Sequence, residues 1–297
     1  MKYICVDAGG TKTRFALYNE DGKVLDQEVL PSCHFMKVGY EGMVEILHEG
    51  YSVLKDRNDF SENELILSLG LAGYGREEKI RRSIETALAD KFRNQRYVLH
   101  NDIEIAMEAA FSGRDGIMLI AGTGSIAFCR HQGKMRRSGG WGYLFGDEGS
   151  AYWLGRKLLE VFSKEEDGRL EKSLIYDLLM KHLKLQHGHD LITYVRETLG
   201  NRREDIAKLA LILYKAASGG DKRALELYDE AAKELASLVI AAGRETTGDV
   251  DVAYFGGVFE AKELILDPLR AYLPERFTLN KPEGSPEYGA YLLAKKD

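Results

Sequence analysis

The sequence has few cysteines, and their arrangement matches neither a disulfide framework nor a metal site. Its 297 residues include three cysteines, Cys5, Cys33 and Cys129, which is an odd number without CxxC spacing. Disulfide-stabilised domains and zinc sites need cysteines in even sets or at close, regular spacing. The cysteine content therefore disfavours both classes and fits a reducing compartment, so the cytoplasm is the expected location.

Long apolar runs and an excess of basic charge are also missing. No apolar stretch approaches the ~20 residues that a membrane-spanning helix needs. The start of the chain lacks the pattern of a secretory signal, because Lys2 is followed by a predicted strand that reaches Asp7. A formal net charge of -6 offers no basic surface for nucleic acid. We therefore expect a small-molecule partner and neither a nucleic-acid nor a membrane partner.

A strand, a glycine-rich turn and a second strand occur twice along the chain. The first copy, "YICVDAG" then "TRFALYN", ends at the turn residues Asp21-Gly22, and the second, within "GIMLIAGTGSIAFCRHQGK", ends at Gln132-Gly133. The copies lie more than a hundred residues apart, which is too far for a solenoid repeat and suits two related domains. Two unrelated glycine-rich hairpins would give the same local pattern.

Helical and strand patterns alternate around these hairpins, which predicts an α/β class with partly parallel sheets. After Gly149 the chain is expected to be largely helical until "VDVAYFGG", the last expected strand, and a closing helix in "PEYGAYLLAKK". The histidine-containing segment "KHLKLQHGHD" is interpreted as a solvated linker, because its spacing matches no common metal-ligand pattern.

Both glycine-rich turns are suited to a phosphate ligand. Glycine has no Cβ, so the backbone N–H groups of "DAGGTKT" and "AGTGS" can approach phosphate oxygens closely, and the threonine hydroxyls add donors. Neither turn matches the P-loop pattern or the Rossmann fingerprint. The pair is typical of a ligand with several phosphates. Asp7, just before the first turn, could hold Mg²⁺ through water, or it could simply initiate the turn.

A second carboxylate follows the predicted strand "RYVLHN". Asn101 and Glu104 have capping-box spacing, which places Asp102 in the first turn of a helix. There it is either an acid favoured by the helix dipole or a general base for a substrate hydroxyl. The local pattern fits both interpretations.

The segment "GGWGYLFGDEGSAYWLG" has the most unusual composition in the chain. The broad face of a tryptophan suits a sugar ring, and a neighbouring carboxylate can accept hydrogen bonds from hydroxyl groups. Trp141 and Asp147 are therefore candidate sugar contacts, although Asp147 could also be an acid at a helix start. Trp153 is expected in the core of the following helix.

Taken in order, "VDAGGTKT", "HND", "AGTGS", "GGWGYLFGDEGSAYWLG" and "YFGGVF" resemble motifs of the BadF/BadG/BcrA/BcrD ATPase family, most closely its N-acetylglucosamine kinase branch within the actin-like sugar kinase superfamily. The resemblance covers the whole chain. It implies an α/β fold of two ribonuclease H-like domains with ATP and sugar in an interdomain cleft. The implied domains are residues 1–112, joined by the C-terminal helix 286–297, and residues 113–285, which carry a helical insertion.

The resemblance also implies roles for individual residues. ATP would be bound by Gly9, Gly10, Thr11 and Lys12, by Thr123, Gly124 and Ser125, and by Gly256 and Gly257 under the adenosine; sugar would be bound by Cys33, Trp141, Gly142 and Asp147. Asp102 resembles the catalytic base, and Asp7 would hold Mg²⁺ through water. Cys33 departs from the pattern of the N-acetylglucosamine kinases, which usually offer an asparagine to the sugar at this position. A thiol is a poor hydrogen-bonding substitute for that amide.

The implied reaction is the phosphorylation of a sugar hydroxyl by ATP. The expected acceptor is O6 of N-acetylglucosamine, and glucosamine and N-acetylmuramic acid stay open as substrates. A homodimer is also expected from the resemblance. One rival is an ATPase activator of a dehydratase or reductase, which needs thiolates for an iron–sulfur cluster at a dimer seam. Cys5 and Cys129 fall within predicted strands, which disfavours it. The other rival is a chaperone or filament protein, for which "GGWGYLFGDEG" would have to serve in packing.

Overall fold

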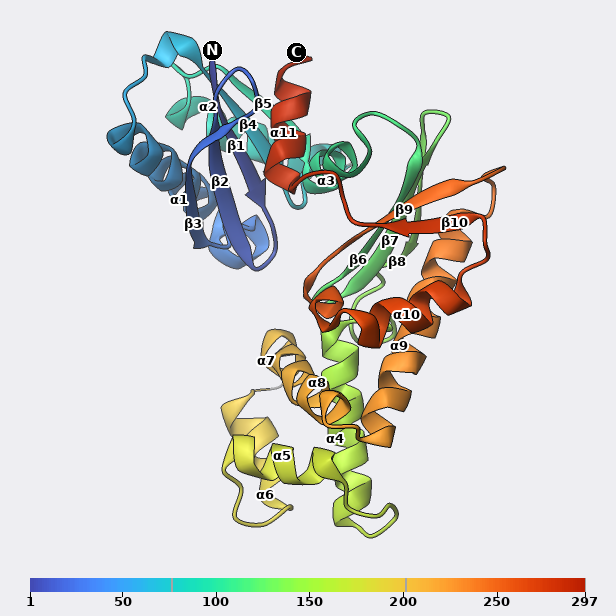
Figure 1. The fold of residues 1–297 in the computed structure, drawn as a ribbon. Helices are drawn as coiled ribbons and strands as arrows, with labels where there is room; N and C mark the ends of the chain where they lie inside the picture. The colour runs from blue at the N-terminus through green and yellow to red at the C-terminus, as the bar shows by residue number, and fades with distance from the viewer. Residues whose placement is uncertain (76, 201, 297) are drawn as a thin grey trace. The chain divides into compact units, whose positions relative to one another are not determined.

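The computed structural model describes residues 1–75, 77–200 and 202–296 (Figure 1). The chain divides into two compact units, one formed by Met1–Arg114 with Pro282–Asp297 and one formed by Asp115–Lys281. We call them the N-terminal unit and the C-terminal unit. Each contains a mixed five-stranded sheet with helices packed around it, which confirms the predicted α/β class.

The N-terminal unit is built on a sheet with the strand order β3-β2-β1-β4-β5. β1, β2 and β3 pair antiparallel through tight turns, whereas β4 and β5 continue the sheet in parallel with β1. The strands are β1 (Lys2–Ala8), β2 (Lys12–Tyr18), β3 (Val24–Pro31), β4 (Leu65–Leu71) and β5 (Tyr97–Asn101). The helices are α1 (Phe35–Arg57), the 3-10 turn η1 (Glu62–Glu64), α2 (Glu78–Lys91), α3 (Asp102–Phe111) and α11 (Pro286–Ala294).

The last helix of the chain completes this unit. α11 lies beside β1 and α3 (Figure 1), and the ring of Tyr291 meets that of Tyr3 edge-on with centroids 5.2 Å apart. Ser68 of β4 donates its hydroxyl to the Ala290 carbonyl at 2.9 Å. A Cβ at Gly289 would collide with the carbonyl of Ile105 in α3, so glycine is required for this close approach. β4 is buried at every position because helices cover both of its faces.

The C-terminal unit repeats this plan with the strand order β10-β9-β6-β7-β8. β6, β7 and β8 pair antiparallel, and β9 and β10 follow in parallel with β6, so the β6–β7 hairpin occupies the place that the β1–β2 hairpin has in the first sheet. The strands are β6 (Gly116–Ala121), β7 (Ser125–His131), β8 (Lys134–Gly139), β9 (Val250–Phe255) and β10 (Phe277–Asn280). The repeated order explains the repeated sequence pattern.

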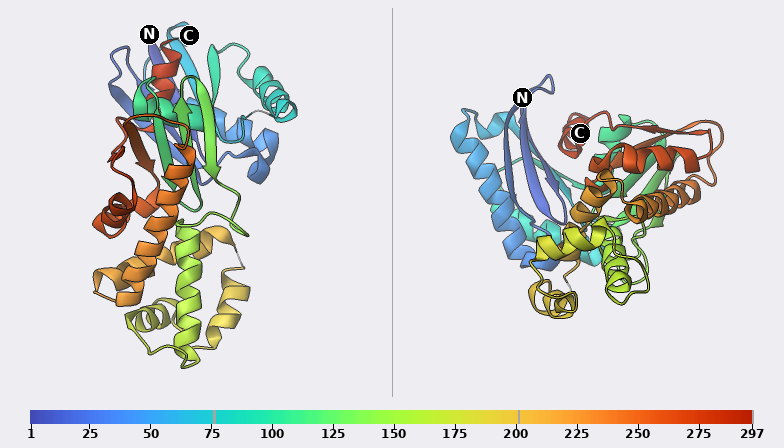
Figure 2. Two further views of the ribbon diagram at one scale, coloured as in Figure 1. Left: turned by 90° about the vertical axis from the view of Figure 1, so that its right-hand side faces the viewer. Right: turned by 60° about the horizontal axis from the view of Figure 1, so that its bottom comes forward.

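Most helices of the C-terminal unit extend from one end of its sheet (Figures 1 and 2). These elements are α4 (Ala151–Glu166), α5 (Leu174–Leu183), α6 (Asp190–Thr193), the π-helical turn η2 (Tyr194–Thr198), α7 (Arg203–Lys208) and α8 (Ala210–Ser218). α9 (Lys222–Ala242) packs along β6, β7 and β8, and η3 (Gly257–Ala261) and α10 (Glu263–Tyr272) also lie beside the sheet. Trp153 of α4 is buried in the core, as predicted.

Two expectations from the sequence are wrong. β9 is not the last strand, because β10 follows it and pairs with it in parallel; β10 has only four residues, too few to show a clear period. The segment 181–190 is not wholly a linker, since it contains the end of α5 and the start of α6, and Leu183 within it is buried.

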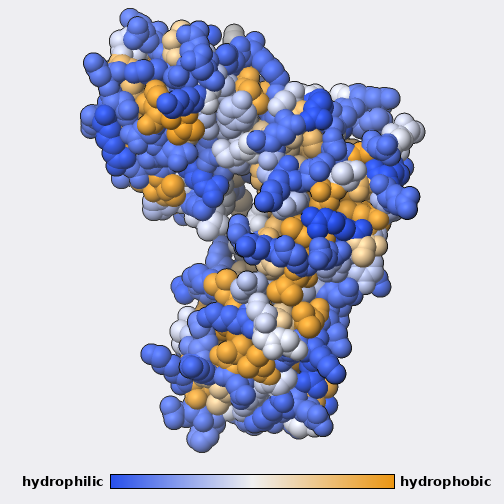
Figure 3. Space-filling model, in the orientation of Figure 1, coloured by the Kyte–Doolittle hydropathy of each residue, from blue (hydrophilic) through white to orange (hydrophobic). Residues whose placement is uncertain are grey.

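Hydrophilic residues cover most of the face drawn in Figure 3, in keeping with a sequence in which 30% of residues are charged. Across the described ranges, the model contains no helix with the length and apolar character needed to cross a membrane.

Candidate functional site

The turn between β1 and β2 presents backbone that is available to a ligand. The Gly9 amide donates to the Lys12 carbonyl at 3.1 Å, and Ser32 donates its hydroxyl to the Gly9 carbonyl at 2.9 Å. These two bonds hold the base of the turn. Gly10, Thr11 and Lys12 are exposed at its tip, and a Cβ at Gly10 would meet open space. The tip can therefore receive an anionic group, as the sequence pattern predicts.

Asp7 lies near the end of β1, directly opposite Arg14 in the β1–β2 register. Burial raises the pKa of Asp7 to about 7, and the negative charges of Glu287 and Asp102 add to the increase. Arg14 opposes it only partly, since its guanidinium is 3.9 Å from the Asp7 carboxylate and 3.8 Å from that of Glu287. The charge of Lys12 also acts to lower the pKa of Asp7, but burial and the two carboxylates outweigh both cations.

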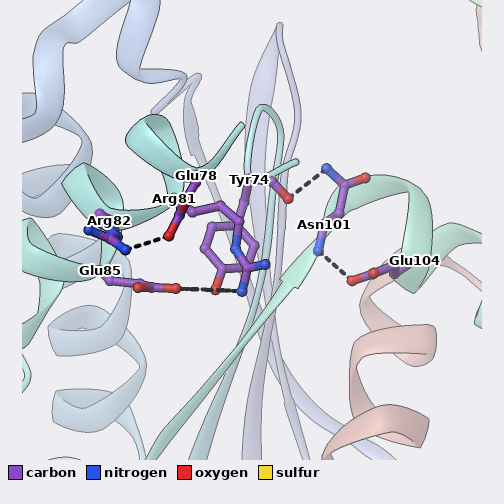
Figure 4. Close-up of polar contacts among 7 residues, drawn as sticks. All are labelled: Tyr74, Glu78, Arg81, Arg82, Glu85, Asn101 and Glu104. Atoms are coloured by element: carbon purple, nitrogen blue, oxygen red, sulfur yellow. Dashed lines mark hydrogen bonds and ion pairs between the residues drawn. The ribbon is translucent and has the colours of Figure 1, made fainter. Parts of the chain in front are cut away.

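Asp102 is the first residue of α3 and follows β5 without a loop. The predicted capping box is present: Asn101 accepts a hydrogen bond from the Ile103 amide at 2.9 Å, and its own amide donates to Glu104 at 2.9 Å (Figure 4). Burial raises the pKa of Asp102 to about 6, although bonds from backbone amides act to lower it. The capping box is thus formed by Asn101 and Glu104, while the Asp102 carboxylate also accepts a hydrogen bond from the Ile103 amide at 3.0 Å.

Asn101 is also fixed from the neighbouring strand end. Its side-chain amide donates to the Tyr74 carbonyl at 3.0 Å, in the loop that follows β4 (Figure 4). Tyr74 is anchored in turn by a 2.7 Å hydrogen bond from its hydroxyl to Glu85 and by the guanidinium of Arg81 over its ring. This chain of contacts ties the ends of β4 and β5 to α2 and holds the start of α3 in place.

Cys33 lies inside the core of the N-terminal unit, where its side chain is 2% exposed. Its amide donates to the Thr13 hydroxyl at 3.0 Å, and that hydroxyl donates to the Pro31 carbonyl. Burial raises the pKa of the Cys33 thiol. In this structure Cys33 therefore packs in the core, and its contact with a sugar stays a prediction.

The turn between β6 and β7 is tied to the start of α4. The Gly122 amide donates to the Gly124 carbonyl at 2.9 Å, and the Ala151 amide donates to the Gly122 carbonyl at 2.8 Å. Ser125 is buried, and its hydroxyl donates to the Glu148 carbonyl at 2.6 Å. Ser125 thus joins the turn to the "GDEG" segment, while Thr123 and Gly124 remain partly exposed.

Asp147 is not the cap of α4, a role that belongs to Ser150, whose hydroxyl oxygen accepts a hydrogen bond from the Trp153 amide. The Asp147 side chain is 4% exposed and accepts a 2.8 Å charge-assisted bond from Arg203 of α7. Its backbone has a φ of 57°, in the left-handed region. Sequence analysis missed Arg203, which stands 56 residues away and belongs to no motif.

Trp141 stands in an exposed apolar loop between β8 and α4. Its side chain is 68% exposed, and the guanidinium of Arg137 lies 5.5 Å from its ring centroid. Gly142 follows with a φ of 91°, and Leu144 and Phe145 are also exposed. An exposed aromatic surface of this kind is suited to the apolar face of a sugar.

The two glycines after β9 lie at the base of the β6–β7 turn. Gly256 has a φ of 113°, and a Cβ there would collide with the carbonyl of Ala121. Gly257 begins η3, and a Cβ there would meet open space. The C-terminal unit therefore brings Gly256 next to the β6–β7 turn.

The predicted residues thus form two sets, each described within its own unit. The N-terminal set contains Asp7, the β1–β2 turn and Asp102, and the C-terminal set contains the β6–β7 turn, Asp147 and Gly256. A groove of about 560 Å³ between α1 and α2, lined by residues such as Tyr40, Lys91 and Asn94, contains none of the predicted site residues.

Comparison with known proteins matches residues 4–294 to the BadF/BadG/BcrA/BcrD ATPase family. The chain belongs to this family. Its relatives include an N-acetylmuramic acid/N-acetylglucosamine kinase of Clostridium acetobutylicum, with 30% identity over 100% of this chain and 99% of the relative. An N-acetyl-D-glucosamine kinase of Dictyostelium discoideum is 27% identical over 98% of this chain and 97% of the relative.

This member of the BadF/BadG/BcrA/BcrD ATPase family also has solved structural neighbours. A structure from Chromobacterium violaceum, assigned as an N-acetylglucosamine kinase, superposes with a TM-score of 0.76 and 25% identity and covers 98% of each chain. The family expected from the sequence and the α/β fold are both confirmed. The individual residue roles stay predictions.

Proposed function

We propose that this protein transfers the γ-phosphoryl group of MgATP to O6 of N-acetylglucosamine or a related amino sugar, with Asp102 as the general base. The coarser part of this statement, an ATP-dependent sugar phosphotransferase, is confirmed by the ATPase family and by the named kinase relatives. The hydroxyl, the exact sugar and the residue roles are the proposal.

The observation that carries the proposal is the environment of Asp102. A general base works best when its pKa lies near the working pH. Burial brings the pKa of Asp102 to about 6, well above that of an exposed aspartate, and the capping box of Asn101 and Glu104 fixes its place on α3. Its carboxylate would accept the proton of the attacking hydroxyl as the oxygen bonds to the γ-phosphorus and ADP leaves.

The phosphates of ATP would be held by backbone amides of the two turns. Gly10 and Thr11 at the exposed tip of the first turn, and Thr123 with Gly124 in the second, would contact these phosphates. Such transfer depends mainly on positioning and on stabilising charge, since the transition state is loose and anionic. Lys12, exposed at the first tip, adds a positive charge, and Gly256 and Gly257 would lie under the adenosine.

The donor set around Asp7 fits a divalent cation. Mg²⁺ favours carboxylate oxygens and keeps several of its waters. Asp7, with the charges of Glu287 and Asp102 acting on it, would hold the ion through water, and the ion would neutralise charge on the phosphates.

The sugar would be bound by four residues. Trp141 would stack on the sugar ring, Gly142 would allow the sugar to approach closely, and Asp147 would accept hydrogen bonds from the sugar hydroxyls. Cys33 would contact the sugar, as the resemblance implies.

The placement of the cysteines supports the kinase over the activator. Cys5 and Cys129 are buried within β1 and β7, and Cys33 is buried in the core. Thiolates that bind an iron–sulfur cluster between subunits would have to reach a surface.

An ADP-release assay over a panel of hexoses and amino sugars tests the function. We expect the fastest turnover with N-acetylglucosamine, glucosamine or N-acetylmuramic acid, and phosphorus NMR of the product should place the phosphate on O6. Phosphate on O1, or ADP release that does not depend on any sugar, would contradict the proposal. Size-exclusion chromatography tests the expected homodimer.

A further inference from the structure

The ion pair between Asp147 and Arg203 lies directly against the second phosphate turn. A Cβ at Gly124 would collide with Nη2 of Arg203 and would stand 2.8 Å from Oδ2 of Asp147. The guanidinium of Arg203 also lies 5.9 Å from the ring centroid of Tyr143, in the loop that carries Trp141. One arginine therefore contacts the turn proposed for ATP and the two segments proposed for sugar.

The position of Arg203 is set by the packing of α7 on α4. A Cβ at Gly155 of α4 would collide with the carbonyl of Ile206 in α7, so the two helices meet at a closely packed point. Figure 1 shows α7 beside α4. Arg203 is the first residue of α7, and this contact fixes the backbone from which its side chain reaches Asp147.

The contacts of the Asp147–Arg203 pair favour a role in orienting the Asp147 carboxylate over a role in stabilising the fold. Nη2 of Arg203 donates to Oδ2 of Asp147, whereas no described residue donates to Oδ1. The buried Nε of Arg203 also has no hydrogen-bond partner among the described residues. Leaving a buried donor unsatisfied is unfavourable, so this ion pair should contribute little to the stability of the fold. Its more important effect is to fix the conformation of the two side chains.

We propose that Arg203 is a positioning residue for sugar binding. It holds the Asp147 carboxylate by one oxygen, which leaves the other oxygen to accept a hydrogen bond from a sugar hydroxyl. It also places that carboxylate at a set distance from the phosphate turn at Gly124. This inference rests on the proposed function, because it takes Asp147 as a sugar ligand.

The test compares Arg203→Met, Arg203→Lys and a neighbouring control, Arg202→Met, in steady-state kinetics. Arg202, the exposed residue before α7, has an ion pair only with Asp205 among the described residues, so its loss should leave both KM values unchanged. For Arg203→Met we expect the KM for N-acetylglucosamine to rise about tenfold or more, as for loss of a partner that orients a ligand. The KM for ATP should stay within about twofold, and Arg203→Lys should recover part of the loss because it keeps the charge without the planar fork.

Two further measurements separate positioning from a general loss of structure. Circular dichroism and thermal unfolding identify any variant that fails to fold. In the Asp147→Asn background, Arg203→Met should cause little further rise in the sugar KM, because the residue that it positions is already altered. A rise in the KM for ATP equal to that for sugar, or additive effects in the double variant, would overturn the inference.

The wild-type assay keeps the two proposals distinguishable. Turnover with N-acetylglucosamine and an unchanged sugar KM in Arg203→Met would overturn the role of Arg203 and leave the kinase proposal intact. Absence of turnover with every amino sugar in the wild type would overturn the kinase proposal and the inference that rests on it.

Discussion

The side-chain amide of Asn101 donates a 3.0 Å hydrogen bond to the backbone carbonyl of Tyr74. The same side chain caps α3 through the Ile103 amide. One residue therefore joins the loop after β4 to the helix that begins with Asp102. The carboxylate proposed as the base is positioned by backbone that is held at two points.

Replacement of Asn101 by alanine should affect stability and turnover together. Loss of an N-cap costs about 1–2 kcal/mol. Because the start of α3 would also lose its tie to Tyr74, we expect kcat to fall about tenfold or more, since small misplacements of a catalytic group are costly. Chemical denaturation and kinetics measure the two effects.

Ser173→Ala is the matched control. Ser173 lies in the C-terminal unit, where its hydroxyl caps α5 by accepting a 3.3 Å hydrogen bond from the Ile175 amide. The variant should lose a comparable or smaller amount of stability, because Asp221 still accepts from the Ile175 amide, and its kcat should be unchanged. Equal losses of kcat in the two variants would show that capping alone explains the effect.

Asp102→Asn tests the proposed base directly. General base catalysis contributes about 10²–10⁴-fold, so kcat should fall by that order while ATP still binds. Kinetics with the best sugar and calorimetry with ATP check the two parts. Asp90→Asn, an exposed change on α2, is the control and should keep wild-type turnover. Near-normal turnover of Asp102→Asn would exclude the role.

The same variant should be more stable than the wild type at high pH. Asp102 has a folded-state pKa of about 6 against an ordinary value of 3.8, so its ionised form is disfavoured by folding. The wild type therefore loses stability as pH rises from about 4 through 6, whereas the asparagine variant has no such term. At pH 8 we expect Asp102→Asn to gain about 1–3 kcal/mol.

Thermal unfolding of the two proteins between pH 4 and pH 8 measures this difference. The gap in Tm should narrow as the pH falls to 4, where the carboxyl group is almost wholly neutral in the folded chain and about half ionised in the unfolded chain. A gap that is independent of pH would mean that packing, not charge, causes it.

Alanine substitutions at Gly256 and Gly257 form a matched pair that tests the packing of the turn after β9. Gly256→Ala introduces a Cβ that collides with the Ala121 carbonyl at a φ of 113°, so we expect a loss of about 2–4 kcal/mol. Gly257→Ala has open space and should keep the wild-type Tm. Equal Tm values for both variants would show that the chain relieves the clash locally.

Local pattern was enough to predict much of the fold and several parts of the candidate site. The two hairpins, the βα alternation and the capping box of Asn101 and Glu104 all depend on residues close in sequence, whose turn chemistry and periodicity act over a few positions. The four-residue strand β10 was missed because pairing with β9, rather than its own pattern, makes it a strand.

Only the tertiary structure showed which distant groups meet. The partnership of Asp147 with Arg203, the burial of Cys33, and the charges of Glu287 and Asp102 acting on Asp7 each join segments that share no periodic pattern. Short-range sterics and hydrogen bonding depend on residues close in sequence, so the sequence by itself determined the two hairpin turns and the capping box of α3, and its motifs indicated the family. Burial and electrostatics depend on what packs from elsewhere in the chain, and they decided the pKa of Asp102 and the place of Arg203.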